Sequence, residues 1–445
     1  MKKFLLGGTA LFLLGAGAGI AADLPVRAPI YYKAPAPVFD WTGFYVGAFA
    51  GVGVQQSRGQ DPTGAVAGKL DYTGSGVVGG VALGYNWQFG PNWVAGVEGD
   101  IAYFGLSHQV TDWNDFFQYN SKTSGLATAR ARLGYSGGGP TLSYVTGGGA
   151  WVRVEDSLSN LAGTTVVTSS KTRGGYAVGT GVETMLGGNW TAKAESLYVN
   201  VGKGDATLLP ASVYNVQVDH RYNVMKFGVN YLFGGKPQPA LQPHNWNGFY
   251  AGIVGGSGVA DARGTQPGVV GEIGNNGDGF SIGGQLGYNW HFAPSLVAGV
   301  EGDFSWLGIN RSSPQYNDFS ATRNATLGVK TSWLATLRGR LGYSTGPALL
   351  YVTGGGAWVN VTDSWQGANG AVFGPLVTST KTLSGYTAGG GIETLFTLFA
   401  GNWTSRSEYL YVDAGNGAVL ASTANMQINH KFHLFRSGLT YHFGG

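Results

Sequence analysis

The sequence predicts an all-β protein that crosses a membrane as antiparallel β-barrels. Three observations support this fold class. The chain contains two copies of one pattern, the segments of that pattern alternate between apolar and polar residues, and their connections alternate between short and long. We expect two tandem eight-stranded transmembrane barrels, with a single sixteen-stranded barrel as the alternative.

The two copies match over whole domains. Residues 41–47, Trp-Thr-Gly-Phe-Tyr-Val-Gly, return as Trp-Asn-Gly-Phe-Tyr-Ala-Gly at 246–252. The offset between the copies drifts by only a few residues along the chain, which indicates loop insertions between preserved elements and not short solenoid repeats. The predicted order is a signal peptide at 1–22, a proline-rich periplasmic segment at 23–40, a first barrel at 41–234, a proline-rich linker at 235–245 and a second barrel at 246–445.

The amino terminus has the features of a secretory signal peptide. Lys2 and Lys3 precede an apolar run at 4–14, and small residues follow as far as Ala22. The exported chain has no cysteine, so its fold does not rely on disulfides and it has no thiol chemistry. A net charge of +3 without a Lys/Arg cluster excludes a nucleic-acid-binding surface.

The period-two alternation assigns an outer and an inner face to nearly every strand. In the third segment Val97 and Ile101 fall on one face, whereas Glu98 and Asp100 fall on the other. That pattern is typical of a strand with lipid outside and a polar barrel interior. The first strand is an exception, because its aromatic residues do not sort onto one face. These are Phe44, Tyr45 and Phe49.

The connections indicate how the barrels are oriented. Tight turns rich in Gly, Pro and Asn are expected at 88–92, 136–140 and 186–189, and longer polar loops at 55–74, 107–124, 155–171 and 202–219. Short turns in the periplasm and long loops outside the cell are the arrangement found in outer-membrane barrels. We therefore expect residence in the outer membrane of a Gram-negative cell.

Each copy carries four acids and four bases on its inner face. They are Glu98, Asp100, Glu183, Glu195, Arg130, Arg132, Lys193 and Lys226 in the first copy, and Glu301, Asp303, Glu393, Glu408, Arg338, Arg340, Arg406 and Arg436 in the second. Isolated buried charges cost several kcal/mol each, so the balance favours a paired layer that fills the interior. The alternative is that these charges line the watery channel of a porin.

Several motifs resemble a known family, the alphaproteobacterial outer-membrane small β-barrel proteins of the RopB and immunogenic outer-membrane antigen type, with an OmpA-like barrel domain. The motifs are Ala-Asp-Leu-Pro at 22–25, the opening segment at 41–47, Gly-Tyr-Asn-Trp at 84–87, Arg-Leu-Gly-Tyr at 132–135 and Tyr-Leu-Phe at 231–233. The resemblance covers the mature chain twice. It implies eight-stranded barrels, envelope or host-interaction roles and, for some members, hemin binding.

Chemistry-bearing residues are sparse. Seven histidines, at 108, 220, 244, 291, 430, 433 and 442, show no metal-ligand spacing, so we predict no metal, no cofactor and no enzymatic activity. His220 and His430 occupy equivalent places near the outer ends of the eighth strands, where we weigh a hemin-ligating or catalytic role against a polar rim position. An aromatic loop carries a possible recognition patch for host or ligand, with Trp113, Phe116, Phe117 and Tyr119; folding back onto the rim is the alternative.

The predicted function is that of a structural, surface-exposed barrel protein that supports envelope integrity and contacts a host or ligand through its loops. A porin for small solutes and a hemin-binding surface protein are the alternatives. The expected partners are outer-membrane lipid and lipopolysaccharide, the barrel-assembly machinery during biogenesis, and a host or small-molecule ligand at the loops.

Overall fold

The fold is described from a computed structural model of the chain. It describes residues 39–60, 69–111, 117–160, 164–204, 207–208, 215–233, 238, 240–265, 273–315, 325–366, 376–421 and 424–443. The predicted signal peptide lies outside the described residues. Within the described ranges, no helix has the length and apolarity that a transmembrane helix needs.

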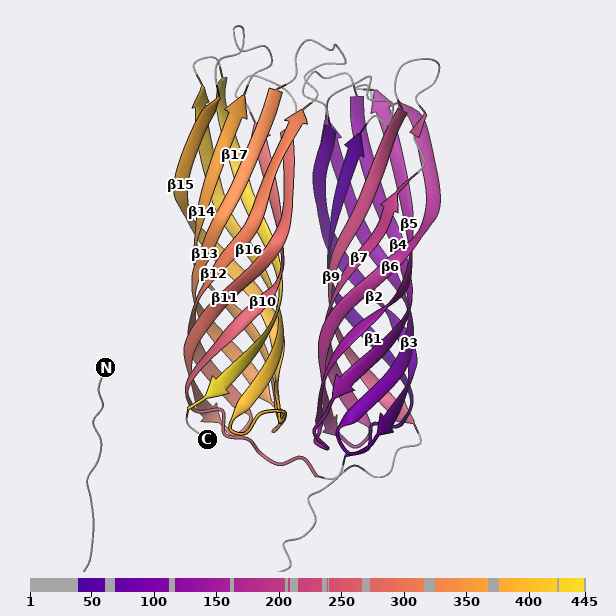
Figure 1. Cartoon of the computed structure of the whole chain (residues 1–445), viewed down its shortest axis with the longest axis vertical. Helices are drawn as coiled ribbons and strands as arrows, with labels where there is room; N and C mark the ends of the chain where they lie inside the picture. Colours follow the sequence, from indigo (N-terminus) through magenta and orange to yellow (C-terminus); the bar gives the residue numbers. More distant parts are fainter. Residues whose placement is uncertain are drawn as a thin grey trace, which may run out of the picture. The chain divides into compact units, whose positions relative to one another are not determined.

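The strands of the first repeat form one closed antiparallel barrel (Figure 1). Its elements are β1 (Gly43–Gln60), β2 (Lys69–Phe89), β3 (Trp93–Thr111), β4 (Phe117–Tyr135), β5 (Thr141–Asn160), β6 (Thr165–Gly187), β7 (Trp190–Lys203), the short β8 (Thr207–Leu208) and β9 (Asn215–Phe233). Each long strand pairs with the next, β8 pairs only with β9, and β9 returns to β1 with Phe44 opposite Phe233.

The second repeat closes a barrel of its own. It consists of β10 (Gly248–Thr265), β11 (Ile273–Ala293), β12 (Leu296–Gln315), β13 (Ala325–Ser344), β14 (Ala348–Gln366), β15 (Val377–Leu395), β16 (Trp403–Ala421) and β17 (Ala424–His442). β17 pairs with β10, so this sheet has no free edge. Two eight-stranded barrels are therefore confirmed, and the sixteen-stranded alternative is wrong.

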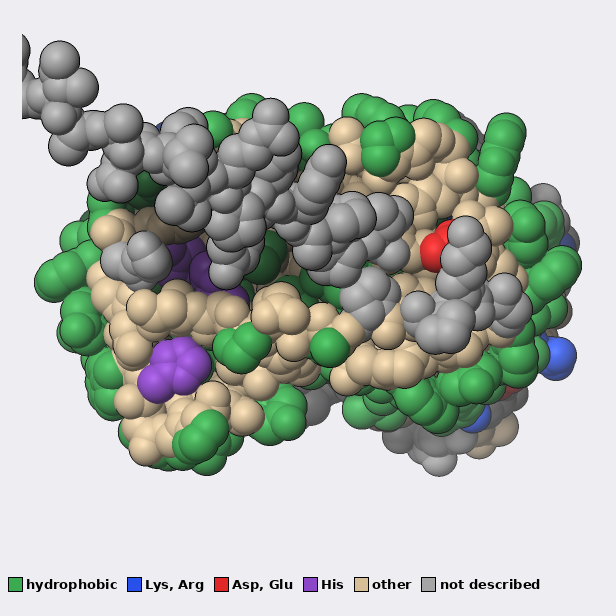
Figure 2. Space-filling view, turned by 90° about the horizontal axis from the view of Figure 1, so that it is seen from below, with side chains coloured by type: hydrophobic (Ala, Val, Ile, Leu, Met, Phe, Trp, Pro, Cys, Tyr) green, Lys and Arg blue, Asp and Glu red, His purple; other side chains and the backbone are tan. Residues whose placement is uncertain are grey.

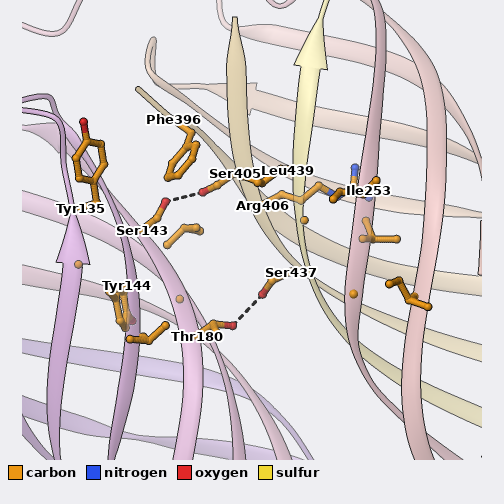
Figure 3. Close-up of a pocket in the computed structure, with 18 of the residues that line it drawn as sticks. Tyr135, Ser143, Tyr144, Thr180, Ile253, Phe396, Ser405, Arg406, Ser437 and Leu439 are labelled. Atoms are coloured by element: carbon orange, nitrogen blue, oxygen red, sulfur yellow. Dashed lines mark hydrogen bonds between the residues drawn. The ribbon is translucent and has the colours of Figure 1, made fainter. Parts of the chain in front are cut away.

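Burial follows the predicted alternation of faces. On β3, Val97 is 60% exposed whereas its neighbour Glu98 is 5% exposed. Figure 3 shows the corresponding alternation of side-chain direction on β5 and β16, where Ser143 and Ser405 point away from the interiors of their barrels and Tyr144 and Arg406 point inward. Ser405 is nevertheless buried, at 6% exposure. Outward apolar and inward polar side chains are the arrangement that a bilayer imposes on a barrel.

Large aromatic side chains mark the membrane boundary near the short turns. Trp87, Trp93 and Trp190 project outward at the ends of their strands and are 44–61% exposed. Aromatic girdles at this level are a feature of transmembrane barrels, because indole rings are stable at the interface between headgroups and hydrocarbon.

The first strand also alternates, contrary to the expectation from the sequence. Phe44 is 61% exposed on the outer face, whereas Tyr45 and Phe49 are 1% and 6% exposed inside the barrel. The sequence did not separate the two faces because Tyr45 and Phe49 are aromatic residues that face the polar interior, where each contacts a charged side chain. The Tyr45 hydroxyl donates to Glu98 at 2.8 Å, and the Lys226 ammonium lies 4.5 Å from the centre of the Phe49 ring.

The strands run much further into the predicted long loops than the sequence suggested. β1 continues to Gln60 and β2 starts at Lys69, so most of the 55–74 region is paired strand. The long strands contain 14 to 23 residues, although about 9–11 are enough to cross the hydrocarbon. The predicted loop bounds were wrong because polar strand extensions beyond the bilayer lose the apolar alternation that marks a spanning segment.

The short turns match the prediction. β2 and β3 are joined by three residues, and Gly90 adopts a left-handed conformation there with φ 68°. Glycine adopts this conformation without the steric cost that a Cβ atom brings. The corresponding turn between β15 and β16 is longer than that between β6 and β7, which accounts for part of the drift between the two repeats.

Candidate functional site: the interior of each barrel

Arg130 lies at the centre of a charge layer inside the first barrel. Its guanidinium contacts Glu98 at 2.7 Å, Asp100 at 2.8 Å and Glu195 at 3.0 Å. Thr128 accepts a hydrogen bond from Nε of Arg130 and donates one to Asp100. One cation therefore joins carboxylates from β3 and β7, on separate parts of the barrel wall.

The other inward charges of the first barrel extend this layer. Lys193 contacts Glu98 at 2.6 Å, Lys226 contacts Asp100 at 2.9 Å, and Arg132 contacts Glu183 at 3.0 Å. The Arg132 guanidinium also lies over the rings of Tyr45 and Tyr144. All eight predicted inward charges of this repeat are at most 5% exposed.

The second barrel repeats the layer with arginine in place of lysine. Arg338 bonds to Glu301, Asp303 and Glu408, and Arg340 contacts Glu393 at 2.9 Å. Two arginines stand at the positions of Lys193 and Lys226, and they share Glu408 as a partner. These are Arg406, with Glu301 at 2.7 Å and Glu408 at 3.0 Å, and Arg436, with Glu408 at 2.6 Å and Asp303 at 2.8 Å.

Apolar side chains fill the interior on the outer side of each charge layer. In the first barrel this layer includes Phe104, Leu126, Val152 and Tyr222, all at most 2% exposed. In the second barrel it consists of the equivalent cluster, with Leu307, Ile309, Leu334, Ala357, Val359, Val361, Leu410, Val412, Phe432 and Leu434. On the periplasmic side, Trp41 and Trp246 are 1% and 0% exposed. Charged and apolar layers together leave the charged side chains inaccessible to water.

A buried polar cluster lies further toward the outer end of each barrel. His220 is fully buried, with Nδ1 2.7 Å from the Ser57 hydroxyl and Nε2 3.3 Å from Asp156. In the second barrel His430 Nε2 lies 3.1 Å from Asp363. Both histidines are fully buried, so neither is exposed at the rim. Ser57 and His220 have no exposed surface, so a substrate cannot reach this Ser-His-Asp arrangement.

Tyr119 does not belong to a surface patch. It lies on β4, is 7% exposed, and its hydroxyl donates to Asp156 at 2.7 Å inside the barrel. The prediction failed because β4 begins at Phe117, within the stretch that resembled a loop. Trp113 and Phe116 lie outside the described residues, and the side chain of Phe117 is also outside them.

The sequence did not reveal the aspartate partners of the histidines. Asp156 and His220 come from strands that do not pair directly, β5 and β9, so no local spacing joins them. Their equivalence to Asp363 and His430 in the second repeat was the one available signal, since the duplication preserves both members of the pair.

Comparison with known proteins agrees with this architecture. A family model described as the outer membrane protein beta-barrel domain matches residues 32–233 and again residues 229–443. The chain belongs to this family. As a member of it, the protein is an outer-membrane β-barrel protein, located in the cell outer membrane.

Individual relatives match about one repeat each. The 31 kDa outer-membrane immunogenic protein of Brucella melitensis biotype 1 is 32% identical over 244 residues, which cover 52% of this chain and all of the relative. The 22 kDa outer membrane protein of Rhizobium leguminosarum bv. viciae is 32% identical over 177 residues, covering 39% and 67%. The solved structure of Neisserial surface protein A aligns with 43% of this chain and 98% of its own at 20% identity and a TM-score of 0.23.

Proposed function

We propose that this protein is a structural component of the outer membrane. It stabilises the envelope and displays the long connections between its strands at the cell surface. The observation that carries the proposal is the filled interior. All sixteen inward charges are at most 6% exposed, and each layer is covered by buried apolar side chains on its outer side. A water-filled diffusion channel would leave lumen-facing charges exposed, so the arrangement disfavours a porin.

The pairing of the charges gives the barrels the rigidity that such a role needs. A buried cation that bridges several carboxylates ties strands on different sides of the wall together, because breaking one partner leaves an uncompensated charge. Arg130 and Arg338 each contact carboxylates from two separate strands. Relatives from Brucella are named as immunogenic outer-membrane proteins, which supports surface exposure for this chain too. Hemin binding remains a prediction from resemblance.

A deletion strain tests this function. Loss of the protein should increase leakage of a periplasmic reporter enzyme and sensitivity to bile-salt detergent, and the wild-type gene should restore both. A matched variant with residues 112–116 and 316–324 replaced by Gly-Ser sequence should also restore them, because the barrels are unchanged. Unaltered leakage, or slower uptake of small solutes as the only effect of the deletion, would contradict the proposal.

A further inference from the structure

The periplasmic mouth of the second barrel is rich in histidine, unlike that of the first. Figure 2 shows histidine side chains gathered on this face, some of them within a recess. The duplication identifies what each one replaces. His244, His291 and His442 stand where the first repeat has Phe39, Gln88 and Leu232, respectively. Three equivalent positions thus carry imidazoles in the second barrel only.

At the equivalent mouth of the first barrel, these positions carry apolar or amide side chains. Phe39 and Leu232 are 4% and 2% exposed and belong to one apolar cluster with Trp41. Gln88 accepts a hydrogen bond from the Trp41 backbone at 2.9 Å, and His291 accepts the equivalent bond from Trp246 at 3.3 Å. Packing therefore needs no histidine at two of these positions. In the second barrel Nε2 of His442 takes over the bond that Asn230 donates to Glu183 in the first, but His244 and the other nitrogen of His442 have no counterpart there.

His442 has an unused nitrogen inside the barrel end. The residue is 1% exposed, and its Nε2 lies 2.9 Å from Oε1 of Glu393, whose other oxygen contacts Arg340 at 2.9 Å. The carboxylate can only accept, so Nε2 donates to it. A neutral imidazole then has a lone pair at Nδ1, and this buried atom has no hydrogen-bond partner. A buried nitrogen without a hydrogen-bond partner is destabilising.

His244 has a second unused nitrogen at the same mouth. Its Nε2 is buried without a partner, and its ring centre lies 6.5 Å from that of His442 and 4.8 Å from that of Trp246. His291 and His244 line one hollow of about 850 Å³ at this mouth.

We propose that His244 and His442 bind a divalent transition-metal ion such as Zn²⁺ at the periplasmic mouth of the second barrel. Neutral imidazoles are its preferred nitrogen ligands, and a carboxylate on the second nitrogen, here Glu393 on His442, is the usual device that fixes the ligating tautomer. Water would complete the coordination of the ion, because Nε2 of His291 already accepts the Trp246 backbone hydrogen bond. The proposal is independent of the envelope role proposed above.

Ion binding requires a small movement of the linker. With metal–nitrogen bonds of about 2.0–2.1 Å, two imidazoles on one ion have ring centres roughly 5–6 Å apart. His244 lies on the irregular segment before β10, so it can approach His442, which is held by its strand. In the free arrangement, no three His, Asp or Glu side chains among the described residues have metal-binding geometry.

Zinc titration of the full-length, tag-free protein in detergent micelles tests this site, with a chromophoric chelator as competitor. We expect one ion per chain in the wild type and loss of that ion in the double variant His244→Phe/His442→Leu, since the variant removes both protein ligands. That variant carries the residues that occupy the equivalent positions of the first barrel, where they are packed in an apolar cluster. His220→Asn, distant from the mouth, should bind zinc as the wild type does.

A variant that creates a second site tests the proposal even if the variant that removes the first site folds poorly. Phe39→His/Leu232→His in the first barrel should raise the stoichiometry toward two ions per chain. Substitution with Co²⁺ should give the visible absorption of a nitrogen-ligated ion in the wild type and lose it in the His244→Phe/His442→Leu variant. Absence of zinc binding in the folded wild type, or equal binding by the wild type and the folded loss variant, would overturn the proposal.

Discussion

At the scale of single residues, the central feature is the mutual dependence of the buried charges. Arg130 contacts three carboxylates, and each of those has a further basic or hydroxyl partner. Replacing a whole buried network by apolar residues is often neutral, but removing one member is strongly destabilising because the others stay buried and charged. The stability of the layer therefore depends on its completeness.

Arg130→Met tests this dependence. We expect the free energy of unfolding to fall by about 3–5 kcal/mol, because Glu98, Asp100 and Glu195 lose their shared cation. Urea unfolding in micelles, followed by tryptophan fluorescence and by the gel mobility of the unheated protein, measures the change. Arg153→Met is the matched control on the exposed outer face of β5 and should stay within about 0.5 kcal/mol of the wild type. Equal losses for both variants would show that the layer contributes no special stability.

At the scale of the elements, sequence periodicity predicted the strands well wherever a bilayer enforces it. Alternation assigned Val97 outward and Glu98 inward because lipid selects apolar side chains on one face of β3. Beyond the hydrocarbon this selection ends. The outer ends of β1, β2 and β4 carry mostly polar residues with few apolar positions, so the sequence predicts loops there, although backbone pairing continues to Gln60 and from Phe117.

Sequence periodicity also did not predict which residues of different strands lie close together. The inward charges could be predicted as a layer, because each lies at a similar height above a turn, but the individual partners could not. Pairs such as His220 with Asp156 and His442 with Glu393 depend on the curvature that brings non-adjacent strands together across a lumen. That curvature is a property of the closed barrel and has no local signature in the chain.

Inward glycines make this tight curvature possible, which gives a prediction for β5. A Cβ atom on Gly148 would overlap the carbonyl oxygen of Ala129, whereas one on the outward Gly147 would meet nothing closer than 3.7 Å. Gly148→Ala should therefore destabilise the barrel by about 1–3 kcal/mol through overpacking, and Gly147→Ala by much less. Urea midpoints of the two variants in micelles measure the difference. Indistinguishable midpoints would mean that the wall relaxes freely around an added methyl group.

At the scale of the whole molecule, duplication has preserved the plugged barrel and changed its ends. The charge layer, the apolar layer and the histidine–aspartate pair occur in both copies, with lysine exchanged for arginine in the second. The periplasmic mouths have diverged, from phenylalanine and leucine in one copy to histidine in the other. Conservation of the filling in both copies indicates that the closed interior is the shared requirement of the two barrels.

Single-channel recording of the refolded full-length protein in planar bilayers tests the filled interior most directly. Because buried, paired charges and apolar side chains occupy each lumen, we predict a bilayer that stays silent or shows only brief, very small openings in molar KCl. Insertion is verified independently by protease protection of the strands in the same lipid. Large, stable conductance steps from the inserted protein would contradict the account and make the two barrels open pores.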